Sequence, residues 1–189
     1  AAVGIARDCG GTIDDDDVLI ADSAGTVTGR EGAVGNWRSS FIGVNAGLTA
    51  GLGLIGDTFE TAITWDAWPD FDALVRERVN AALGEVVKGH SALSCRFTHV
   101  YTDGPAPYYT FSGLGTKGGE AEQWQAIKDT ASAAVIEGGG TITHHHSVGR
   151  MHRAGWAQQR PDLFEAALRG ARSALDPNGI MNPGVLYDP

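Results

Sequence analysis

The stretch ALSCRFTHVYTDGPAPYYTFSGL, residues 92–114, decides the fold. In residues 92–101 larger apolar or aromatic side chains alternate with small or polar ones, and this period of two is typical of a half-buried strand. The larger side chains on the predicted common face are Leu93, Cys95, Phe97, His99 and Tyr101. Asp103-Gly104-Pro105 then favours a turn, after which residues 108–114 can return as an antiparallel partner. The stretch therefore predicts a β-hairpin.

Two helices are predicted on either side of this hairpin. Residues 68–88 place apolar side chains three and four positions apart, and Pro69 suits the first turn of a helix. Residues 120–137 repeat that spacing and run into Gly138-Gly139-Gly140, which ends a helix. With a short strand expected at residues 141–144, the element order predicts the α+β class, as a ferredoxin-like antiparallel sheet with helices packed on one face.

A third helix is predicted between Pro161 and Asp176. Its apolar face is expected to be buried and comprises Leu163, Phe164, Ala167, Leu168, Ala171 and Leu175. At the start of the chain, residues 1–11 suit a helix that ends at Gly10-Gly11. Because no capping residue precedes this helix, we expect the chain to be a fragment or a processed piece of a longer polypeptide.

Composition argues against several classes of function. A chain of 189 residues with 42% hydrophobic residues can bury a sizeable core. Its net charge of -9 and its pI near 5.0 argue against nucleic acid as a partner, since such surfaces need clustered Lys and Arg. No apolar run approaches the roughly 18–20 residues of a membrane span. Cys9 and Cys95 show no metal-ligand spacing and indicate buried, reduced thiols, so we expect a cytoplasmic protein.

Two further segments resemble ligand loops only superficially. The acidic run from Asp14 to Asp17 lacks the spacing of a calcium loop, which favours a solvated loop. The glycine-rich segment GLTAGLGLIG, residues 47–56, lacks the Lys-Ser/Thr of a phosphate-binding loop. We expect it to form a helix or strand that packs closely against another backbone.

Three consecutive histidines in TITHHHSVGR, residues 141–150, are the clearest candidate site. If the predicted strand continues through them, His144 and His146 share one face and His145 points the other way. Imidazole titrates near neutral pH and can stabilise an anion or move protons. A surface cluster, or a zinc site with His152 and a carboxylate, is an alternative. Because no HExxH or CxxC spacing occurs, we expect catalysis or substrate binding and no metal.

Five segments resemble one known family when they are taken together in their order. They are DTFETAITWDAW at 57–68, THVYTDGPAPYYTF at 98–111, EQWQAIKDTASAAVIEGGG at 122–140, TITHHHSVGRMHR at 141–153 and LDPNGIMNPGVL at 175–186. The chain is similar to the C-terminal cap domain of FAD-linked oxidases of the vanillyl-alcohol oxidase superfamily. Within that superfamily it resembles the alkyldihydroxyacetonephosphate synthases and their bacterial relatives. The resemblance runs from about Trp37 to Pro189.

The resemblance implies a domain organisation, a cofactor and partners. Residues 37–189 would form the cap domain, and residues 1–36 a truncated helix and loop that lead in from an FAD-binding domain. The implied cofactor is FAD, whose nucleotide end that other domain would hold, in the same polypeptide or as a separate subunit. The remaining expected partner is a small-molecule substrate. A homodimer is also expected, because the face that meets the FAD-binding domain would expose apolar area in the isolated chain.

The resemblance also implies roles for single residues. His144, His145 and His146 match the family's three-histidine motif at the flavin and substrate, and Tyr108 matches its acid/base tyrosine. His146 and Asn182 would contact the cofactor, while His144 would contact the substrate. The alternative for Tyr108 is a core aromatic, and that for Asn182 is a plain Asn-Pro turn.

Three other residues complete the predicted site. Arg150 is expected to bind the substrate through its guanidinium, with a surface ion pair as the alternative. Glu60 and Thr61, from the Phe-Glu-Thr motif, are expected to be structural.

One departure from the family pattern bears on the substrate. In FIGVNAGLTAGLGL, residues 41–54, Ala46 or Gly47 stands where the family places a substrate-binding arginine. Loss of that cation favours oxidation of an alcohol or a 2-hydroxy acid over the synthase reaction on dihydroxyacetone phosphate. Three hypotheses follow. The chain is the cap domain of a flavoenzyme, either an oxidase or a synthase; or it is a stand-alone ferredoxin-like binding module; or it is a zinc hydrolase that uses the histidines.

Overall fold

The computed structural model describes residues 2–14 and 51–187, and the chain divides into two compact units, residues 1–45 and 46–189. In the first unit, helix α1, Ala2–Asp8, ends near the predicted glycines, where Gly10 has a φ of 86°. The predictions for residues 15–17, for Trp37 and for the Ala46/Gly47 position fall outside the described residues. The division of the chain at residue 36 stays a prediction.

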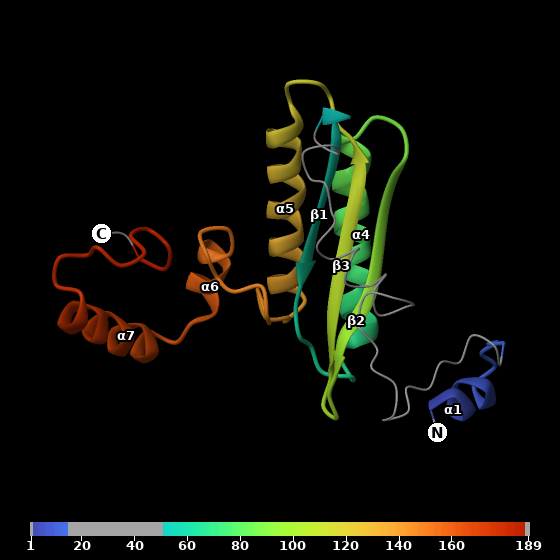
Figure 1. Ribbon diagram of the computed structural model, residues 1–189, viewed down its shortest axis with the longest axis horizontal. Coiled ribbons are helices and arrows are strands. Elements are labelled where there is room, and N and C mark those ends of the chain that lie inside the picture. The colour runs from blue at the N-terminus through green and yellow to red at the C-terminus, as the bar shows by residue number, and fades with distance from the viewer. Residues whose placement is uncertain (1, 15–50, 188–189) are drawn as a thin grey trace, which may run out of the picture. The chain divides into compact units, whose positions relative to one another are not determined.

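The second unit contains a three-stranded antiparallel sheet (Figure 1). Its strands are β1, Leu54–Glu60, β2, Ser91–Val100, and β3, Pro105–Leu114, in the order β1-β3-β2. The predicted hairpin is confirmed as the pair β2 and β3. Residues 54–56 of the glycine-rich segment belong to β1, as expected, and residues 47–50 are outside the described part.

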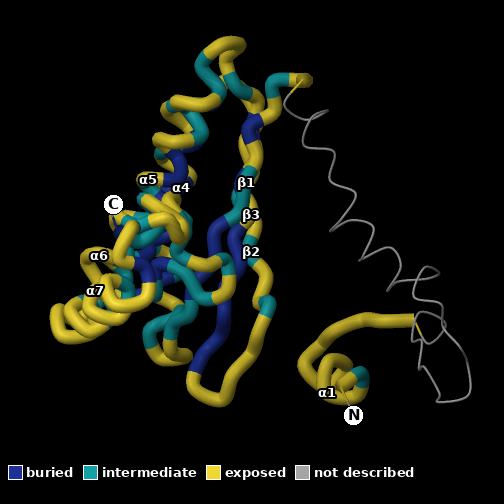
Figure 2. The backbone as a smooth tube through the Cα atoms, turned by 60° about the vertical axis from the view of Figure 1, so that its left-hand side comes forward, coloured by how far each residue is buried: buried dark blue, intermediate teal, exposed yellow. Residues whose placement is uncertain are grey.

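Helices α4, Trp68–Val86, and α5, Glu120–Glu137, pack together against one face of this sheet (Figure 2). Large apolar and aromatic side chains of both helices and of the facing strand positions form the core. Those with 0–2% exposure include Phe71, Val75, Val79, Leu83, Tyr109, Phe111, Ile127 and Val135. Each such burial stabilises the fold by about 1.5–3 kcal/mol. The predicted α+β class with helices on one face is thereby confirmed.

The strand predicted at residues 141–144 does not form, so that prediction is wrong. The segment does lie beside the end of β1, because the Thr141 N–H donates to the Ala62 carbonyl at 3.2 Å and the Thr61 hydroxyl donates to the Thr141 carbonyl at 2.6 Å. The Ile142 N–H donates instead to the Gln159 side chain at 2.8 Å, and the N–H groups of His144 and His145 donate to the Glu60 side chain at 2.7 Å each. Side-chain acceptors have replaced the backbone ladder that a fourth strand would need.

A β-bulge in β2 changes the predicted alternation. Leu93 and Cys95 pack on the core as predicted, and Phe97 contacts Trp68 with ring centroids 4.9 Å apart. Register then shifts between Phe97 and His99. Since a bulge inserts one extra residue, His99 leaves the face of Phe97 and points to the sheet face without helices. The prediction that both share one face is wrong.

Two further helices follow, α6, Arg153–Gln159, and α7, Asp162–Leu175. The third predicted helix is confirmed as α7. The predicted burial of its apolar face is wrong, because no residue of α7 is buried, and Leu163 and Leu175 are 86% and 82% exposed. The segment after α7 folds back on both helices, where Tyr187 contacts the Arg169 guanidinium at 4.0 Å and the Trp156 ring at 5.8 Å.

Backbone conformation and close packing require glycine at two positions of the run after α5. Gly139 has a φ of 79°, in the left-handed region that favours glycine. A Cβ on Gly140 would lie 2.7 Å from the Thr61 hydroxyl oxygen and 2.8 Å from the Phe71 ring. The end of α5 can therefore approach β1 closely enough to deliver residues 141–146 to its end.

Both described cysteines are free. Burial raises the pKa of the partly buried Cys95 thiol to about 11, which keeps it protonated and unreactive. Cys9 is exposed, so the prediction of buried thiols is wrong for that residue. Among the described helices, none has the length and apolar character needed to cross a membrane.

Candidate functional site

A buried carboxylate shapes the histidine loop. Glu60, the last residue of β1, is 2% exposed. Its Oε1 accepts the Thr143 hydroxyl at 2.8 Å and the backbone N–H groups of His144, His145 and His146 at 2.7, 2.7 and 2.8 Å. Three consecutive N–H groups reach one oxygen only when the backbone turns tightly. Glu60 therefore imposes a loop where the sequence pattern predicts a strand.

The second oxygen of Glu60 faces two histidine rings. Oε2 is buried, has no hydrogen-bond partner among the described residues, and lies 3.2 Å from His145 Nδ1 and 3.6 Å from His144 Nδ1. Burial acts to raise the pKa of Glu60, but the N–H groups of His146, His145 and His144 and the Thr143 hydroxyl outweigh it and leave the pKa below its ordinary value of 4.5. A fixed negative charge thus lies under the imidazoles.

All three histidines lie on the same side of the sheet, beside Tyr108. The His146 and His145 ring centroids are 5.1 and 5.9 Å from that of Tyr108. The His144 ring lies 5.5 Å from that of His145, and its Nε2 is 3.0 Å from Tyr101 Oη. His145 was expected to point away only if the strand continued, and because a loop forms instead, its ring lies beside Tyr108 with those of the other two.

Tyr108 belongs to the sheet face that carries no described helix. Its neighbour Tyr109 is the core aromatic, fully buried, with its hydroxyl donating to Asp72 Oδ1 at 2.8 Å. Successive side chains of a strand point to opposite faces, so Tyr108 points away from α4 and α5. Its hydroxyl donates to Thr58 Oγ1 at 3.1 Å. The structure thus separates Tyr108 from the helix-covered core, which was the alternative for this residue.

The surroundings of His146 change its titration. Burial lowers its pKa, Glu60 acts in the opposite direction, and His145 and Lys128 lower the pKa further, so that it lies below the ordinary 6.5. His146 is therefore neutral near pH 7 and able to accept a proton.

His152 stabilises the loop through a hydrogen bond to its backbone. Ser147, directly after the histidines, has a φ of 68°, which is uncommon for a residue with a side chain. His152 is 8% exposed, and its Nδ1 lies 2.9 Å from the Ser147 carbonyl oxygen. Because a carbonyl only accepts, Nδ1 carries the proton. His152 therefore holds the loop in its turn.

His99 joins the cluster instead of His152. Its ring lies 5.2 Å from that of His144 and 5.5 Å from that of His145, centroid to centroid. Ring nitrogens of these three residues lie within 4.8 Å of one another. Imidazoles at such spacing can share one transition-metal ion. A zinc site was expected to include His152. The histidines that the structure groups are instead His99, His144 and His145, and the bulge in β2 brings His99 to them.

The side chain of Arg150 reaches the C-terminal turn that contains Asn182. An Arg150 N–H donates to the Pro183 carbonyl at 2.9 Å. Asn182 is exposed, has a φ of 45°, and its carbonyl accepts the Val185 N–H at 3.3 Å. Arg150, His146 and Val185 line a cavity of about 820 Å³. The cofactor role of Asn182 and the substrate role of Arg150 stay predictions.

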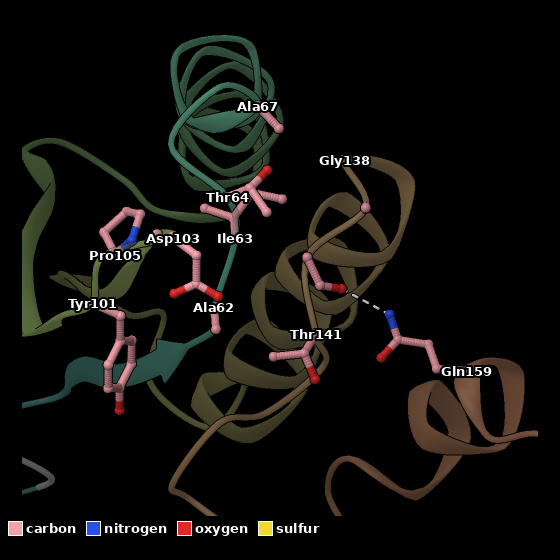
Figure 3. A pocket seen from close by; sticks show the side chains of 13 residues that line it. Ala62, Ile63, Thr64, Ala67, Tyr101, Asp103, Pro105, Gly138, Thr141 and Gln159 are labelled. Carbon is pink, nitrogen blue, oxygen red and sulfur yellow. Dashed lines mark hydrogen bonds between the residues drawn. The ribbon is translucent and has the colours of Figure 1, made fainter.

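A second cavity opens next to the histidines, at the end of the sheet. It has about 780 Å³ and is lined by the loop after β1, the turn between β2 and β3, and the glycines after α5. Figure 3 shows Tyr101 and Thr141 on opposite sides of it, with Asp103 between them. Gln159 of α6 donates to the Gly140 carbonyl at 2.7 Å and holds the glycine turn. Since Tyr101 also touches His144, this cavity adjoins the candidate site.

Sequence reasoning missed three contributors to this site. Glu60 is expected to be structural alone, and its buried carboxylate is the acceptor that shapes the histidine loop. Thr58 and Arg96 lie on β1 and β2 at positions that share the face of Tyr108, and this follows only from the strand register. The long-range pairing of Glu60 with residues 143–146 had no local signal at all.

Comparison with known proteins agrees with the resemblance seen in the sequence. Residues 4–186 match the family described as FAD linked oxidases, C-terminal domain. The chain is 30% identical over 168 residues to alkyldihydroxyacetonephosphate synthase of Caenorhabditis elegans, covering 87% of this chain and 28% of that protein. It is 24% identical over 161 residues to the uncharacterized FAD-linked oxidoreductase YgcU of Escherichia coli K12, covering 80% of this chain and 32% of that protein.

A solved structure supports the fold. A structure of alkyldihydroxyacetonephosphate synthase superposes with a TM-score of 0.50 at 15% identity, covering 85% of this chain and 24% of that chain. The chain spans less than a third of the curated relatives that it matches. It belongs to the family of the C-terminal domains of FAD-linked oxidases.

Proposed function

We propose that this chain is the substrate-side cap domain of an FAD-dependent oxidoreductase that acts on an alcohol or a 2-hydroxy acid. The observation that supports it most directly is the convergence of Tyr108 and the three histidines over the buried Glu60 carboxylate. A phenol, three imidazoles and a fixed anion together form a proton-handling site on the sheet face that the described helices do not cover, where Tyr108 itself is 9% exposed.

In this proposal Tyr108 and His146 move the proton of the substrate. The Tyr108 hydroxyl is oriented by Thr58, and His146 is neutral near pH 7. His146 accepts the proton of the substrate hydroxyl, and the Tyr108 hydroxyl turns from Thr58 to donate a hydrogen bond to the same oxygen. His144 and His145 stabilise negative charge on the substrate, and Glu60 balances a ring that becomes positively charged.

The residues present fit the ring end of a flavin. The sheet face around Tyr108 carries small or hydroxyl-bearing exposed residues, namely Gly56, Ser94, Thr110 and Ser112, so a flat ring system can approach the strands. His146 and Asn182 are the residues proposed to contact it. The chemistry that FAD supplies in such an enzyme is acceptance of a hydride. We propose that another part of the protein, an FAD-binding domain, holds the nucleotide end and that the protein is cytoplasmic.

The absorption spectrum of the protein expressed from its complete reading frame tests this proposal. A yellow protein that bleaches when an alcohol or a 2-hydroxy acid is added without oxygen is the expected result. Turnover only of acyl-dihydroxyacetone phosphate with a fatty alcohol would replace the oxidase with the synthase reaction. A colourless protein that takes up no FAD would favour the binding module.

Tyr108→Phe tests the site within that protein. Loss of the phenol should lower kcat by about 10²- to 10⁴-fold and leave FAD content unchanged. Tyr187→Phe is the matched control, since the Tyr187 hydroxyl is buried without a partner among the described residues. Equal activity of the two variants would contradict the role of Tyr108.

A metal-dependent reaction is a second candidate, favoured by the spacing of His99, His144 and His145. It predicts stoichiometric zinc or another transition metal by elemental analysis of the purified protein. His99→Ala should abolish this binding, whereas His90→Ala, an exposed histidine ahead of β2, should leave it unchanged. Protein without metal after zinc addition and gel filtration would remove this candidate.

A further inference from the structure

Arg96 stands directly beside Tyr108. In the register of the sheet it pairs with Tyr108, so both side chains lie on the face turned away from α4 and α5. The guanidinium carbon lies 4.7 Å from the centroid of the Tyr108 ring. A guanidinium stacked on a ring keeps its N–H edges free, and the ring limits its orientation.

The Arg96 guanidinium has no carboxylate or carbonyl partner in the part of the chain that the structure describes. Other described arginines are engaged in such contacts. Arg76, Arg78, Arg160 and Arg169 pair with carboxylates, and Arg150 and Arg172 donate to carbonyls. Arg96 is exposed, so its N–H groups face solvent at the site. An unneutralised cation in this place is available to an anionic ligand.

The nearby carboxylate does not neutralise Arg96. Glu60 is buried beneath the histidine loop, its Oε1 is occupied by four donors, and its Oε2 faces the rings of His144 and His145. The residues that flank Arg96 on its own face are uncharged, Ser94 on β2 and Thr110 on β3. The positive charge of Arg96 therefore acts on the space in front of Tyr108.

We propose that Arg96 binds the anionic group, a carboxylate or a phosphate, of the substrate that reacts at Tyr108. This inference rests on the proposed function and adds a substrate class to it. A carboxylate or phosphate matches the fork of a guanidinium in two parallel hydrogen bonds. Bound there, the anion lies against the edge of the Tyr108 ring, which places the reacting carbon of a small substrate near Tyr108 and His146.

The experiment is anion binding by isothermal titration calorimetry to the protein from the complete reading frame, loaded with FAD. The probes are oxalate and inorganic phosphate, with ethylene glycol as the neutral control. Arg96→Gln should weaken binding of the preferred anion by roughly 10- to 100-fold, and Arg96→Lys by less, because a lysine keeps the charge without the fork. Preference for oxalate indicates a carboxylate substrate, and preference for phosphate a phosphorylated one.

Arg78→Gln is the matched control. It removes the same charge from an exposed arginine of α4, on the other side of the sheet, and should leave the dissociation constant unchanged. Failure of wild type to bind either anion, or equal binding by wild type and Arg96→Gln, would overturn the proposal. Bleaching of the flavin by a panel of alcohols and 2-hydroxy acids, added without oxygen, is recorded on the same protein preparations. Anion binding that depends on Arg96 in a protein without flavin reduction would refute the proposed function and leave the anion site in place.

Discussion

Replacement of Glu60 tests whether one buried side chain holds the candidate site together. Glu60→Ala removes the acceptor of three backbone N–H groups and of the Thr143 hydroxyl, at 2.7–2.8 Å each. Glu60→Gln keeps an oxygen for these donors but places an amide nitrogen toward His144 and His145. The two variants therefore separate the shape of the loop from the charge beneath it.

The expected magnitudes follow from these contacts. Hydrogen bonds to a charged group contribute about 1.5–3 kcal/mol each. Water can reach part of this loop, and removal of the carboxylate relieves a desolvation penalty of several kcal/mol. We therefore expect Glu60→Ala to lower the free energy of unfolding by about 3 kcal/mol, with a fall in Tm of about 10 °C for a domain of this size. Glu60→Gln should lower it by about half as much.

Urea unfolding followed by tryptophan fluorescence measures the loss, and hydrogen exchange of the His144, His145 and His146 amides locates it. Protection of these amides should vanish in Glu60→Ala and persist in part in Glu60→Gln. Glu137→Gln is the control, because Glu137 is 53% exposed and pairs with Arg78 at the surface, where such pairs contribute about 0–1 kcal/mol. If Glu60→Ala and Glu137→Gln were equally stable, the reasoning would be refuted.

Three further predictions concern the rest of the fold. Gly140→Ala should destabilise the domain by about 1–3 kcal/mol, since its Cβ would meet the Thr61 hydroxyl, whereas Gly84→Ala on α4, with open space around it, should be neutral or slightly stabilising in the same urea titration. The Met181 N–H, with further N–H groups, holds the pKa of Asp176 below its ordinary 3.8. Its stabilising effect is complete above pH 3.8 and should fall as the pH drops through the lower pKa of the folded state. The protection factor of the Met181 amide, measured by NMR hydrogen exchange, should therefore fall with acid in wild type and show no such step in Asp176→Asn. The isolated chain should self-associate through the apolar side of α7, and Leu163→Glu should shift sedimentation toward a monomer; a wild-type monomer at all concentrations would contradict this.

The sequence predicted the scaffold well where local pattern carries the information. The hairpin of β2 and β3 follows from a period of two around a turn, and α4, α5 and α7 follow from a period near 3.6. The family resemblance then led to the histidines and to Tyr108, which the structure brings together. The sequence predicted less well which face of the sheet a side chain occupies, because the extra residue of a bulge moved His99 to the other face.

By itself, the sequence determined the α+β class, the family and the candidate residues, because periodicity and motif order are properties of neighbours along the chain. The tertiary structure alone decided that residues 141–146 form a loop and that Arg96 meets Tyr108. It also decided that α7 leaves its apolar side exposed. Glu60 and His144 are 84 residues apart, and Arg96 and Tyr108 meet only through strand register. Such contacts depend on which surfaces the folded chain brings together, and no local propensity encodes them.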